Sequence, residues 1–539
     1  MKLRALQRLS TALLATAACL GGVACGAPPR PAGIAVYASG TDLESGNPLV
    51  TVHSLSRQLQ RYALFVTLAQ YDSLLRPVPY AARAWEWSGD HRTLTFQLVP
   101  GLTWQDGVAT TATDAAFTIN AARDPATGFP RASDLAGVDG AVALDDSTVA
   151  VRFATPPSAF PLIFCELPIV PAHLLARTPH AELRRAGFNL SPVGNGPFSF
   201  VRRTAGQRWE FARNDKFPAA LGGPPKLAGL IVTVVDQPTT KFAGLASGDL
   251  DVAGISPATA YLVRRDPLLR VIEYPILLAN GLVFNVHRPP FDDVRVRRAV
   301  SASLDRARII RAALAGYGVP ASGPVAPENP FALNDPAAAR QDTALADSLL
   351  DAAGWRRNAG GERGRTGHAL RFELLTVGSG DNAVEQLIQA DLAQRGVRMD
   401  IRQVEMGSFL TEARAQQKSF DALLTGIPGD VSLSYLGAMF DSRQAGGALD
   451  YSGYHTAALD ALFDATRAAN SDTARKNAWL AVQRVLADDV PVAWIFHSRG
   501  VQGASARLHG MHMDLRGELV TLHDWVLSSN QATSPRAVH

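Results

Sequence analysis

ARAWEWSGDHRTLTFQLVPGLTWQDGVATTATDAAFTINAARD, residues Ala82–Asp124, is the stretch of the sequence that decides the fold. WEWSGD and the alternating segment LTFQLV predict two consecutive strands. A turn is predicted at Pro100-Gly101, and the segment Trp104–Gly107 then leads into a capped helix expected from Thr113. The order strand, strand, turn and helix predicts a mixed α/β unit.

Three further blocks of sequence carry distinctive patterns. Ser191–Gly254 contains SPVGNGPFSFVRRTAGQRWEFARNDKF and DQPTTKFAGLASGDLDVAG, Asn280–Tyr317 reads NGLVFNVHRPPFDDVRVRRAVSASLDRARIIRAALAGY, and Tyr454–Ser498 ends in DDVPVAWIFHS. With the first segment, these blocks resemble in order and spacing the family 5 extracytoplasmic solute-binding proteins. That family comprises the oligopeptide, dipeptide and nickel receptors of ABC importers. The resemblance covers essentially all of the chain after its N-terminal segment.

The pattern alone predicts a large α/β protein of two or more domains, because 539 residues exceed the size of one core. The resemblance implies a two-lobed periplasmic-binding-protein fold, of type II and similar to cluster C, with an extra domain inserted in lobe one. The implied division is a signal peptide at 1–24, a linker or lipid tether at 25–33, lobe one at 34–76, 191–279 and 492–529, the inserted domain at 77–190, lobe two at 280–491 and a flexible tail at 530–539.

Apolar periodicity and turn residues locate several elements. Helices are predicted over Asp293–Leu314, over Asp342–Ala353 and as a pair from Thr456 to Asp488. The predicted strands are Leu94–Val99, Ser147–Phe153, Leu230–Val235, Leu282–Val286, Leu370–Thr376 and Val492–His497. The polar, glycine-rich segment Arg356–His368 is predicted to be a surface hairpin or loop.

Composition is that of an ordinary soluble globular protein, with 47% hydrophobic and 19% charged residues. The formal net charge is +3, and the three basic residues of 1–24 account for all of it, so the exported chain would be neutral. A nucleic-acid partner is therefore not expected. Arg202-Arg203 and Arg356-Arg357 are interpreted as solvated faces or loops.

Residues 1–24 have the layout of an export signal, because basic residues precede an apolar stretch that contains no acid. Cys25 follows Gly22-Val23-Ala24 and precedes GAPPRPAG, which resembles a bacterial lipoprotein cleavage site. Gly22 stands where that site usually has leucine, and a plain secreted form is the alternative. The protein is expected to be exported, as a periplasmic or cell-surface lipoprotein attached to the membrane through Cys25. Cys165, the one cysteine outside this region, is interpreted as a small buried hydrophobe.

Catalysis is not expected. The chain has no G-x-S-x-G elbow, H-E-x-x-H, P-loop or G-x-G-x-x-G after a suitable strand. No cofactor and no metal site are predicted. His509-Gly510-Met511-His512-Met513 is the one cluster with metal-binding chemistry, and a structural or incidental role is favoured for it. In the family, aromatic residues equivalent to Trp85, Trp87 and Trp104 mostly build the core, and we interpret them as structural.

The resemblance also places a ligand groove between the lobes, where an extended peptide could pair as an added strand. The implied lining is Ser39, Gly40, Thr41, Asp42 and Leu43 after the first strand, Asn285 near the crossover, Thr425, Gly426, Ile427, Pro428, Gly429 and Asp430 with Tyr435, and Phe496 with His497. For Asp42 and Asp430 the alternative is that they cap or close turns, and for Tyr435 that it packs in the core.

Family members that bind peptides hold the free amino group with an aspartate in the segment that corresponds to Thr425–Leu436. Here Pro428 or Gly429 occupies the first acidic position, and Asp430 is either the second, turn-shaping aspartate or a displaced anchor. If Asp430 only shapes a turn, a buried charged terminus would lack its partner. The ligand would then be N-blocked, longer and threaded, or not a peptide.

The expected function is the substrate-binding component of an ABC importer, which captures a peptide or similar small solute by hinge closure. It would deliver this solute to a permease and its ATPase, and the protein is expected to be a monomer. The alternatives are a secreted enzyme or ligand sensor on the same scaffold, or a nickel or metal-chelate receptor of the same family.

Overall fold

The computed structural model describes residues 32–528 except 52, 136, 158, 379–381 and 470. The expected signal peptide, Cys25 and the expected tail 530–539 lie outside the described residues. Among the described helices, none combines the length and the apolar character needed to cross a membrane.

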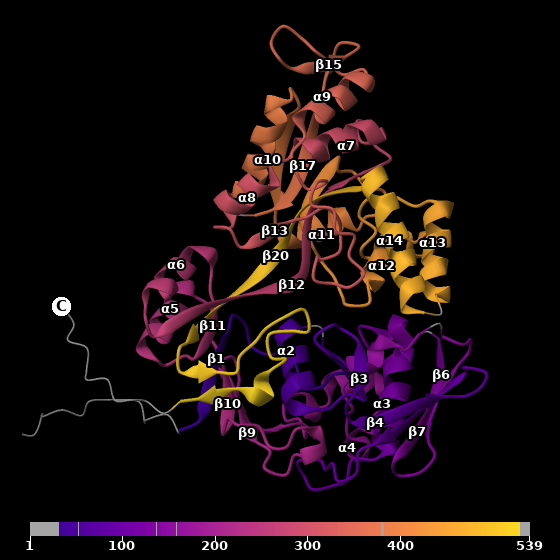
Figure 1. Ribbon diagram of the computed structural model, residues 1–539, viewed down its shortest axis with the longest axis vertical. Coiled ribbons are helices and arrows are strands. Elements are labelled where there is room, and N and C mark those ends of the chain that lie inside the picture. Colours follow the sequence, from indigo (N-terminus) through magenta and orange to yellow (C-terminus); the bar gives the residue numbers. More distant parts are fainter. Residues whose placement is uncertain are drawn as a thin grey trace, which may run out of the picture.

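An 11-stranded mixed sheet runs through both lobes (Figure 1). Its strand order is β18-β17-β19-β12-β20-β11-β1-β10-β9-β8, and β13 pairs with β20. The strands are β1 (Ile34–Ser39), β8 (Phe198–Thr204), β9 (Arg208–Arg213), β10 (Gly229–Val234), β11 (Val252–Gly254), β12 (Leu269–Phe284), β13 (Gly318–Pro320), β17 (Arg371–Val377), β18 (Arg398–Val404), β19 (Ala422–Pro428) and β20 (Val492–Ser505). The arrangement is the expected two-lobed α/β fold.

The helices cover the faces of this sheet and fill the inserted domain. They are α2 (Ser54–Leu59), α3 (Ala112–Arg123), α4 (Ala172–Leu175), α5 (Pro238–Ser247), α6 (Pro257–Arg265), α7 (Val294–Ser303), α8 (Arg306–Ala313), α9 (Thr343–Ala352), α10 (Ala383–Gln394), α11 (Met406–Ala413), α12 (Ser434–Phe440), α13 (Ala457–Ala468) and α14 (Asp472–Asp489). Smaller strands are β2 (Ala69–Tyr71), β3 (Pro77–Pro79), β14 (Arg356–Arg357), β15 (Arg363–Arg365), β16 (His368–Ala369), β21 (Leu508–His509) and β22 (Val526–Leu527).

The long strands β12 and β20 connect the two lobes (Figure 1). They pair antiparallel along most of their length, with a register shift between the pairs Pro275–Arg499 and Ala279–His497. The first six residues of β20, Val492–His497, pair with the lobe-two part of β12 and with β13. The second half of β20 pairs with β11 in lobe one. The chain therefore crosses between the lobes at Ser498, beside an irregularity in the ladder.

The inserted domain is a four-stranded antiparallel sheet, β4 (Ala82–Trp87), β5 (Thr93–Leu98), β7 (Thr148–Phe153) and β6 (Val138–Ala143), in the order given. Helix α3 contacts β6 and β7. The helix begins at Ala112, one residue earlier than predicted, because Thr111 and Asp114 form a capping box. Trp104 is buried and donates a hydrogen bond to Asp114 at 3.3 Å, which confirms its structural role.

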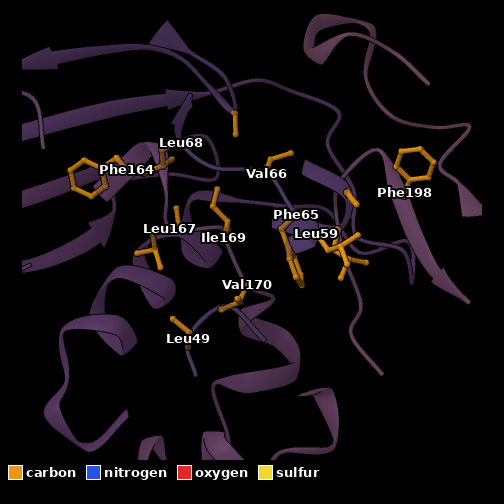
Figure 2. Close-up of a cluster of buried hydrophobic side chains, with 14 of the residues drawn as sticks. Leu49, Leu59, Phe65, Val66, Leu68, Phe164, Leu167, Ile169, Val170 and Phe198 are labelled. Carbon is orange, nitrogen blue, oxygen red and sulfur yellow. The ribbon is translucent and has the colours of Figure 1, made fainter. Parts of the chain in front are cut away.

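The largest hydrophobic core spans lobe one and the inserted domain. Figure 2 shows a part of it where Phe65 and Val66, which follow helix α2, meet Leu167, Ile169 and Val170 of the inserted domain. Trp85 and Trp87 are half-buried at its edge, where Trp85 packs on Phe160 with ring centroids 4.6 Å apart. Because apolar side chains from both parts share one core, the inserted domain and lobe one pack as a unit.

One prediction for lobe two is wrong in detail. The helix predicted over Asp293–Leu314 is two helices, because the carboxylate of Asp305 accepts a hydrogen bond from the backbone N–H of Arg308 at 2.9 Å and starts α8. The segment Arg356–His368, predicted to be a surface hairpin or loop, forms a hairpin of β14 and β15, and β16 pairs with β15 as a third strand. Its Arg363 is buried and pairs with Asp347 at 2.8 Å and Asp351 at 2.6 Å on α9.

A second correction concerns Arg203 in lobe one, which was expected on a solvated face or loop. Its guanidinium pairs with Asp42 at 2.7 Å and lies over the ring of Trp209, 5.3 Å from the centroid. Trp209 also donates to Asp42 at 2.8 Å. The carboxylate of Asp42 therefore ties the segment after β1 to the β8–β9 hairpin.

Candidate functional site

The two lobes meet beside the crossing of β12 and β20. A cavity of about 10 Å³ remains there, which is close to the smallest space that can hold one water molecule. Its walls come from the crossing strands and from lobe two: Leu277, Leu278, Pro324, Val325, Ala326, Asn329, Ile427, Gly429, Asp430, Leu433, Tyr435 and His497. The structure therefore brings Ile427, Gly429, Asp430, Tyr435 and His497 together at one cavity, and their role as ligand-binding residues stays a prediction.

The carboxylate of Asp430 is occupied by local donors. It accepts hydrogen bonds from Ser432 Oγ at 2.5 Å, from the N–H and Oγ of Ser434 at 3.0 and 2.7 Å, and from the N–H of Tyr435 at 3.1 Å. Two of these donors are backbone groups at the start of α12, which have no partner within the helix. In this geometry Asp430 closes the turn before α12, which is one of the two roles considered above.

Tyr435 and His497 are buried at the same cavity. The hydroxyl of Tyr435 donates to the carbonyl of Pro324 at 3.0 Å, and burial raises its pKa above the ordinary value. Burial lowers the pKa of His497 to about 4, and the nearby carboxylate of Glu328 opposes this shift only in part. His497 is therefore a neutral hydrogen-bonding group at pH 7.

The C-terminal half of β19 has a free edge. Its residues pair with β12, in the register Gly281–Thr425, Asn280–Gly426, Ala279–Ile427 and Leu278–Pro428. On the other side β17 pairs only with Ala422 and Leu423. Within the described residues no strand pairs with the outer edge of Thr425–Pro428, so an extended chain could add there.

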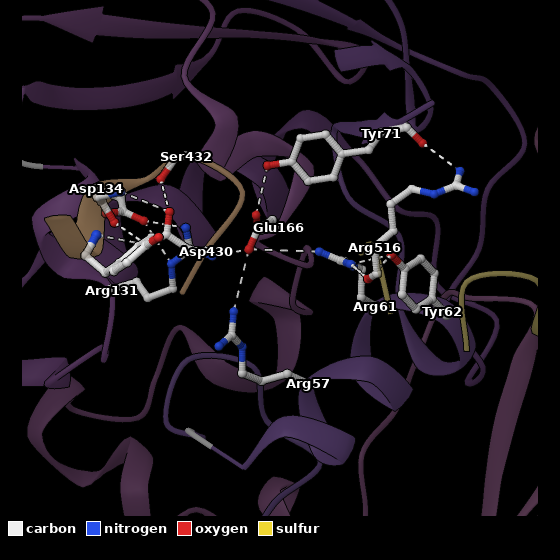
Figure 3. A network of polar contacts seen from close by, with 12 residues as sticks. Arg57, Arg61, Tyr62, Tyr71, Arg131, Asp134, Glu166, Asp430, Ser432 and Arg516 are labelled. Carbon is white, nitrogen blue, oxygen red and sulfur yellow. Dashed lines mark hydrogen bonds and ion pairs between the residues drawn. The ribbon is translucent and has the colours of Figure 1, made fainter. Parts of the chain in front are cut away.

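Opposite Asp430, the inserted domain contributes a buried carboxylate, Glu166. It forms an ion pair with Arg131 and lies 3.5 Å from Arg57 and 3.9 Å from Arg61 (Figure 3). Tyr71 also donates a hydrogen bond to it at 2.8 Å. Burial disfavours the charged form, but Arg131, then Arg61 and Arg57, outweigh burial and lower the pKa of Glu166 to about 2.

Apolar and charged contacts join the inserted domain to lobe two at this point. Val431 and Ala326 of lobe two share one buried cluster with Tyr71 and Cys165. Burial opposes the charge of Arg131. The carboxylates of Glu166, Asp134 and Asp430, in decreasing order of effect, outweigh burial and raise the pKa of Arg131. Arg131 is therefore within electrostatic reach of a carboxylate on the other lobe, as Figure 3 shows.

Other residues implied by the resemblance lie elsewhere. Phe496 is packed in the hydrophobic core of lobe two. Asn285 was expected near the crossover, but it follows Phe284 at the far end of β12, where its amide donates to the carbonyl of Phe420 at 3.0 Å. Phe284, at the same end of β12, pairs with Ala422 of β19, and this places Asn285 deep in lobe two. The expectation for its position is therefore wrong.

The segment Ser39–Leu43 follows β1 and is held within lobe one. Asp42 has the partners described above, Ser39 Oγ donates to the carbonyl of Thr41 at 2.7 Å, and Thr41 Oγ1 lies 3.1 Å from His53. Gly40 and Leu43 belong to the same segment without helix or strand, and none of these residues lines the interlobe cavity. A ligand-binding role for them stays a prediction.

Sequence reasoning missed several polar residues at the interlobe contact. Arg131, Asp134 and Glu166 all come from the inserted domain, and Asn280 donates to Ser498 at 2.8 Å at the crossing. Glu166 had a detectable signal, because it is the one acid within the apolar run PLIFCELPIV. A lone acid in such a run predicts a buried carboxylate with charged partners.

The cluster His509–Met513 shows no metal-binding arrangement. His509 ends the short strand β21, and His512 is exposed, 3.5 Å from Asp514. Within the described part of the chain, no group of three or more His, Cys, Asp or Glu side chains is placed to hold a metal ion.

Comparison with known proteins gives a consistent result. Residues 76–447 match the model of the middle region of bacterial extracellular solute-binding proteins, family 5. Protein XP55 of Streptomyces lividans is 27% identical over 440 residues, which cover 80% of this chain and 78% of that protein. A putative ABC transporter peptide-binding protein of Brucella ovis is 30% identical over 355 residues, 64% of each chain.

Solved structures share the fold. The substrate-binding protein CtaP of Listeria monocytogenes has a TM-score of 0.82 at 22% identity, and the match covers 93% of this chain and 100% of that one. The oligopeptide-binding protein AppA of Bacillus subtilis, in complex with a nonapeptide, has a TM-score of 0.73 at 22% identity, covering 92% and 99%. NikZ of Campylobacter jejuni, in complex with Ni(L-His), has a TM-score of 0.75 at 22% identity, covering 92% and 100%.

Proposed function

Because the chain belongs to the family 5 bacterial extracellular solute-binding proteins, we propose that it captures a peptide or related small solute for an ABC importer. Proteins of this family are binding components of transporters rather than enzymes. The solute would enter between the lobes, and the lobes would close on it by bending at the crossing of β12 and β20. The closed protein would then deliver the solute to a membrane permease.

The observation that carries the proposal is the free edge of Thr425–Pro428 beside the hinge. An extended peptide that adds to this edge satisfies its own backbone groups and those of β19. The adjoining wall, with Tyr435 and His497, supplies neutral polar groups in a buried setting. The cavity of about 10 Å³ cannot hold a peptide, so the hinge must open to admit one.

The carboxylates at this contact bear on the charge of the solute. Asp430 accepts four local hydrogen bonds, and Glu166 is surrounded by Arg131, Arg57 and Arg61. Neither carboxylate is free to receive an α-ammonium group, and burying that group unpaired would cost several kcal/mol. We therefore favour a solute without a buried ammonium group, which is an N-blocked peptide, a longer threaded peptide or another small molecule.

Native mass spectrometry of the protein purified without denaturation tests the function. Tight binding proteins retain their solute during purification, so the expected result is an adduct that is released on denaturation. Its mass and fragmentation would then identify the class of solute. A protein that carries no adduct and binds no member of a peptide library would contradict the proposal.

Export and anchoring belong to the proposal as well. Cleavage after Ala24 would leave Cys25 as a diacylated N-terminus, since stable membrane retention needs more than one acyl chain. Cys25→Ala should then move the protein to the soluble fraction. A variant that stays membrane-bound, or a wild-type protein that is soluble with another N-terminus, would contradict lipidation. We propose that the anchored protein acts as a monomer beside a permease and ATPase.

A further inference from the structure

A second cavity lies within lobe one and the inserted domain, and its lining shares no residue with that of the cavity between the lobes. Its volume is about 600 Å³, within the range of small-molecule sites. Its walls come from residues 61–83, 99, 165, 197–222 and 516–524, and none of the lining residues belongs to lobe two. We call this cavity the lobe-one pocket.

Tyrosine and arginine side chains dominate the polar lining of the lobe-one pocket. Arg61 donates to the hydroxyl of Tyr62 and to the carbonyl of Arg516. Arg516 is paired with Asp514 at 2.7 Å and donates to the carbonyl of Tyr71 at 3.3 Å. These contacts hold two guanidinium groups and two phenol rings in fixed positions, so the wall is organised before any ligand arrives.

Two polar groups of the lining lack a strong partner. Arg83 makes one long hydrogen bond, of 3.4 Å to Gln97, and no ion pair within the described residues. The hydroxyl of Tyr80 has no hydrogen-bond partner among the described side chains and backbone groups, and it is half-buried. Burial raises the pKa of Tyr80, so its phenol remains a donor at neutral pH.

The charges of the lining favour an anion. Of the three arginines that line the pocket, Arg516 is paired with Asp514 and Arg61 lies 3.9 Å from Glu166, whereas Arg83 has no ion pair within the described residues. The one acid of the lining, Asp524, lies 3.6 Å from His523. Guanidinium groups hydrogen-bond carboxylate, sulfonate and phosphate oxygens in a planar fork. Tyrosine rings pack on flat apolar groups. We propose that the lobe-one pocket binds a small organic anion with an aromatic body, whose acid group is held by Arg83 and Tyr80.

The pocket is separated from the interlobe contact by Glu166. In Figure 3, Arg61, Tyr62 and Arg516 lie on one side of this carboxylate, and Arg131 and Asp430 lie on the other. Tyr71 and Arg61 line the pocket and also contact Glu166. A ligand of the lobe-one pocket would therefore occupy a site distinct from the solute transported between the lobes.

Fluorescence titration with anilinonaphthalene sulfonate, an aromatic sulfonate that brightens on leaving water, tests the proposal. We expect one site per chain in the folded wild-type protein. Ala220→Trp places an indole in the pocket and should abolish binding, whereas Ala219→Trp, on the neighbouring exposed residue outside the lining, should not.

Arg83→Gln should weaken binding about tenfold, as expected for loss of one charge-assisted hydrogen bond. Arg92→Gln, an exposed arginine of the same domain, is the charge-matched control.

Neutral anilinonaphthalene should bind at least tenfold more weakly than the sulfonate, because it lacks the acid group. Thermal unfolding of each variant would verify that it is folded. Absence of a site in the wild-type protein, binding that survives Ala220→Trp in a folded variant, or equal affinity for the neutral compound would each overturn the proposal. The result is independent of transport, since retention of a solute between the lobes is measured separately by native mass spectrometry.

Discussion

Arg499, in the lobe-one half of β20, forms an ion pair with Glu328 of lobe two at 2.6 Å. The pair lies beside the point where β12 and β20 lose their register, since Arg499 is opposite Pro275. Both side chains are partly exposed, 17% for Arg499 and 34% for Glu328. The pair therefore bridges the two lobes at the hinge, at a place where a change of angle between the lobes would separate its members.

Removing this ion pair should favour the open form. Arg499→Gln is expected to weaken solute binding roughly twofold, because a partly exposed pair contributes about 0.5 kcal/mol. Calorimetric titration of the variant with a solute identified by mass spectrometry measures the change. Arg311→Gln, an exposed arginine in lobe two, is the control. Tighter binding by Arg499→Gln would show that the ion pair does not support the closed form.

Glu166→Gln should be among the most destabilising single changes at the interlobe contact. The substitution leaves Arg131, Arg57 and Arg61 without their shared carboxylate, and breaking a buried ion pair on one side costs about 3 kcal/mol. Urea unfolding at pH 7 measures the change in the free energy of unfolding, with exposed Glu182→Gln as control. A loss no larger than that of the control would contradict the network drawn in Figure 3.

The carboxylate of Glu166 should also make the free energy of unfolding fall at acid pH. Its pKa is about 2 in the folded protein against an ordinary value of 4.5, so the unfolded chain takes up the proton first. The stability that Glu166 provides is present above pH 4.5 and is lost as the pH falls from 4.5 towards 2. Glu166→Gln should therefore show a flatter dependence of unfolding free energy on pH in this range.

His497 should make the free energy of unfolding depend on pH in a second, higher range. Its folded pKa is about 4 against an ordinary value of 6.5, because burial disfavours the imidazolium. The unfolded chain therefore binds a proton more readily, and up to about 3 kcal/mol of stability is lost as the pH falls from 6.5 to 4. His497→Gln should flatten the unfolding free energy over this interval, whereas exposed His368→Gln should not. An unchanged slope in His497→Gln would show that His497 is not the group that titrates.

The role of Asp430 predicts how the protein responds to the peptide terminus. Because its carboxylate already accepts four local hydrogen bonds, it is not free to pair with an ammonium group, and acetylation of di- and tripeptides should strengthen their binding. Calorimetric titrations should show weaker binding of the free di- and tripeptides than of the acetylated ones, and Asp430→Asn should affect both alike. A clear preference for the free amine that Asp430→Asn abolishes would instead make Asp430 the ammonium anchor.

Local patterns predicted much of the fold. The predicted helix Asp342–Ala353 corresponds to α9, and the pair from Thr456 to Asp488 corresponds to α13 and α14, because apolar spacing and capping residues act over one or two turns. Strand β12 was predicted only at its C-terminal end. Pro275 and a register shift interrupt the pattern of its other half, although β12 still pairs with β20 on both sides of the shift.

The site was less accessible from the sequence, since it depends on contacts between distant residues. Arg131 and Glu166 are 35 positions apart, and Asp430 lies on the other lobe, so no short pattern connects them. The segment from Ile427 to Tyr435 was found through the resemblance, which carries information on spatial position. Asn285 was misplaced because the predicted strand Leu282–Val286 did not show at which end of β12 the lobes cross.

Closure of the two lobes on a solute is the central claim, and small-angle X-ray scattering measures it most directly. The radius of gyration would be compared for the protein stripped of solute and for the same protein saturated with its tightest-binding solute, alongside thermal unfolding. The account predicts a smaller radius and a higher melting temperature with solute, because the solute binds the folded, closed form. An unchanged radius together with a strong rise in melting temperature would show a rigid pocket and would contradict hinge closure.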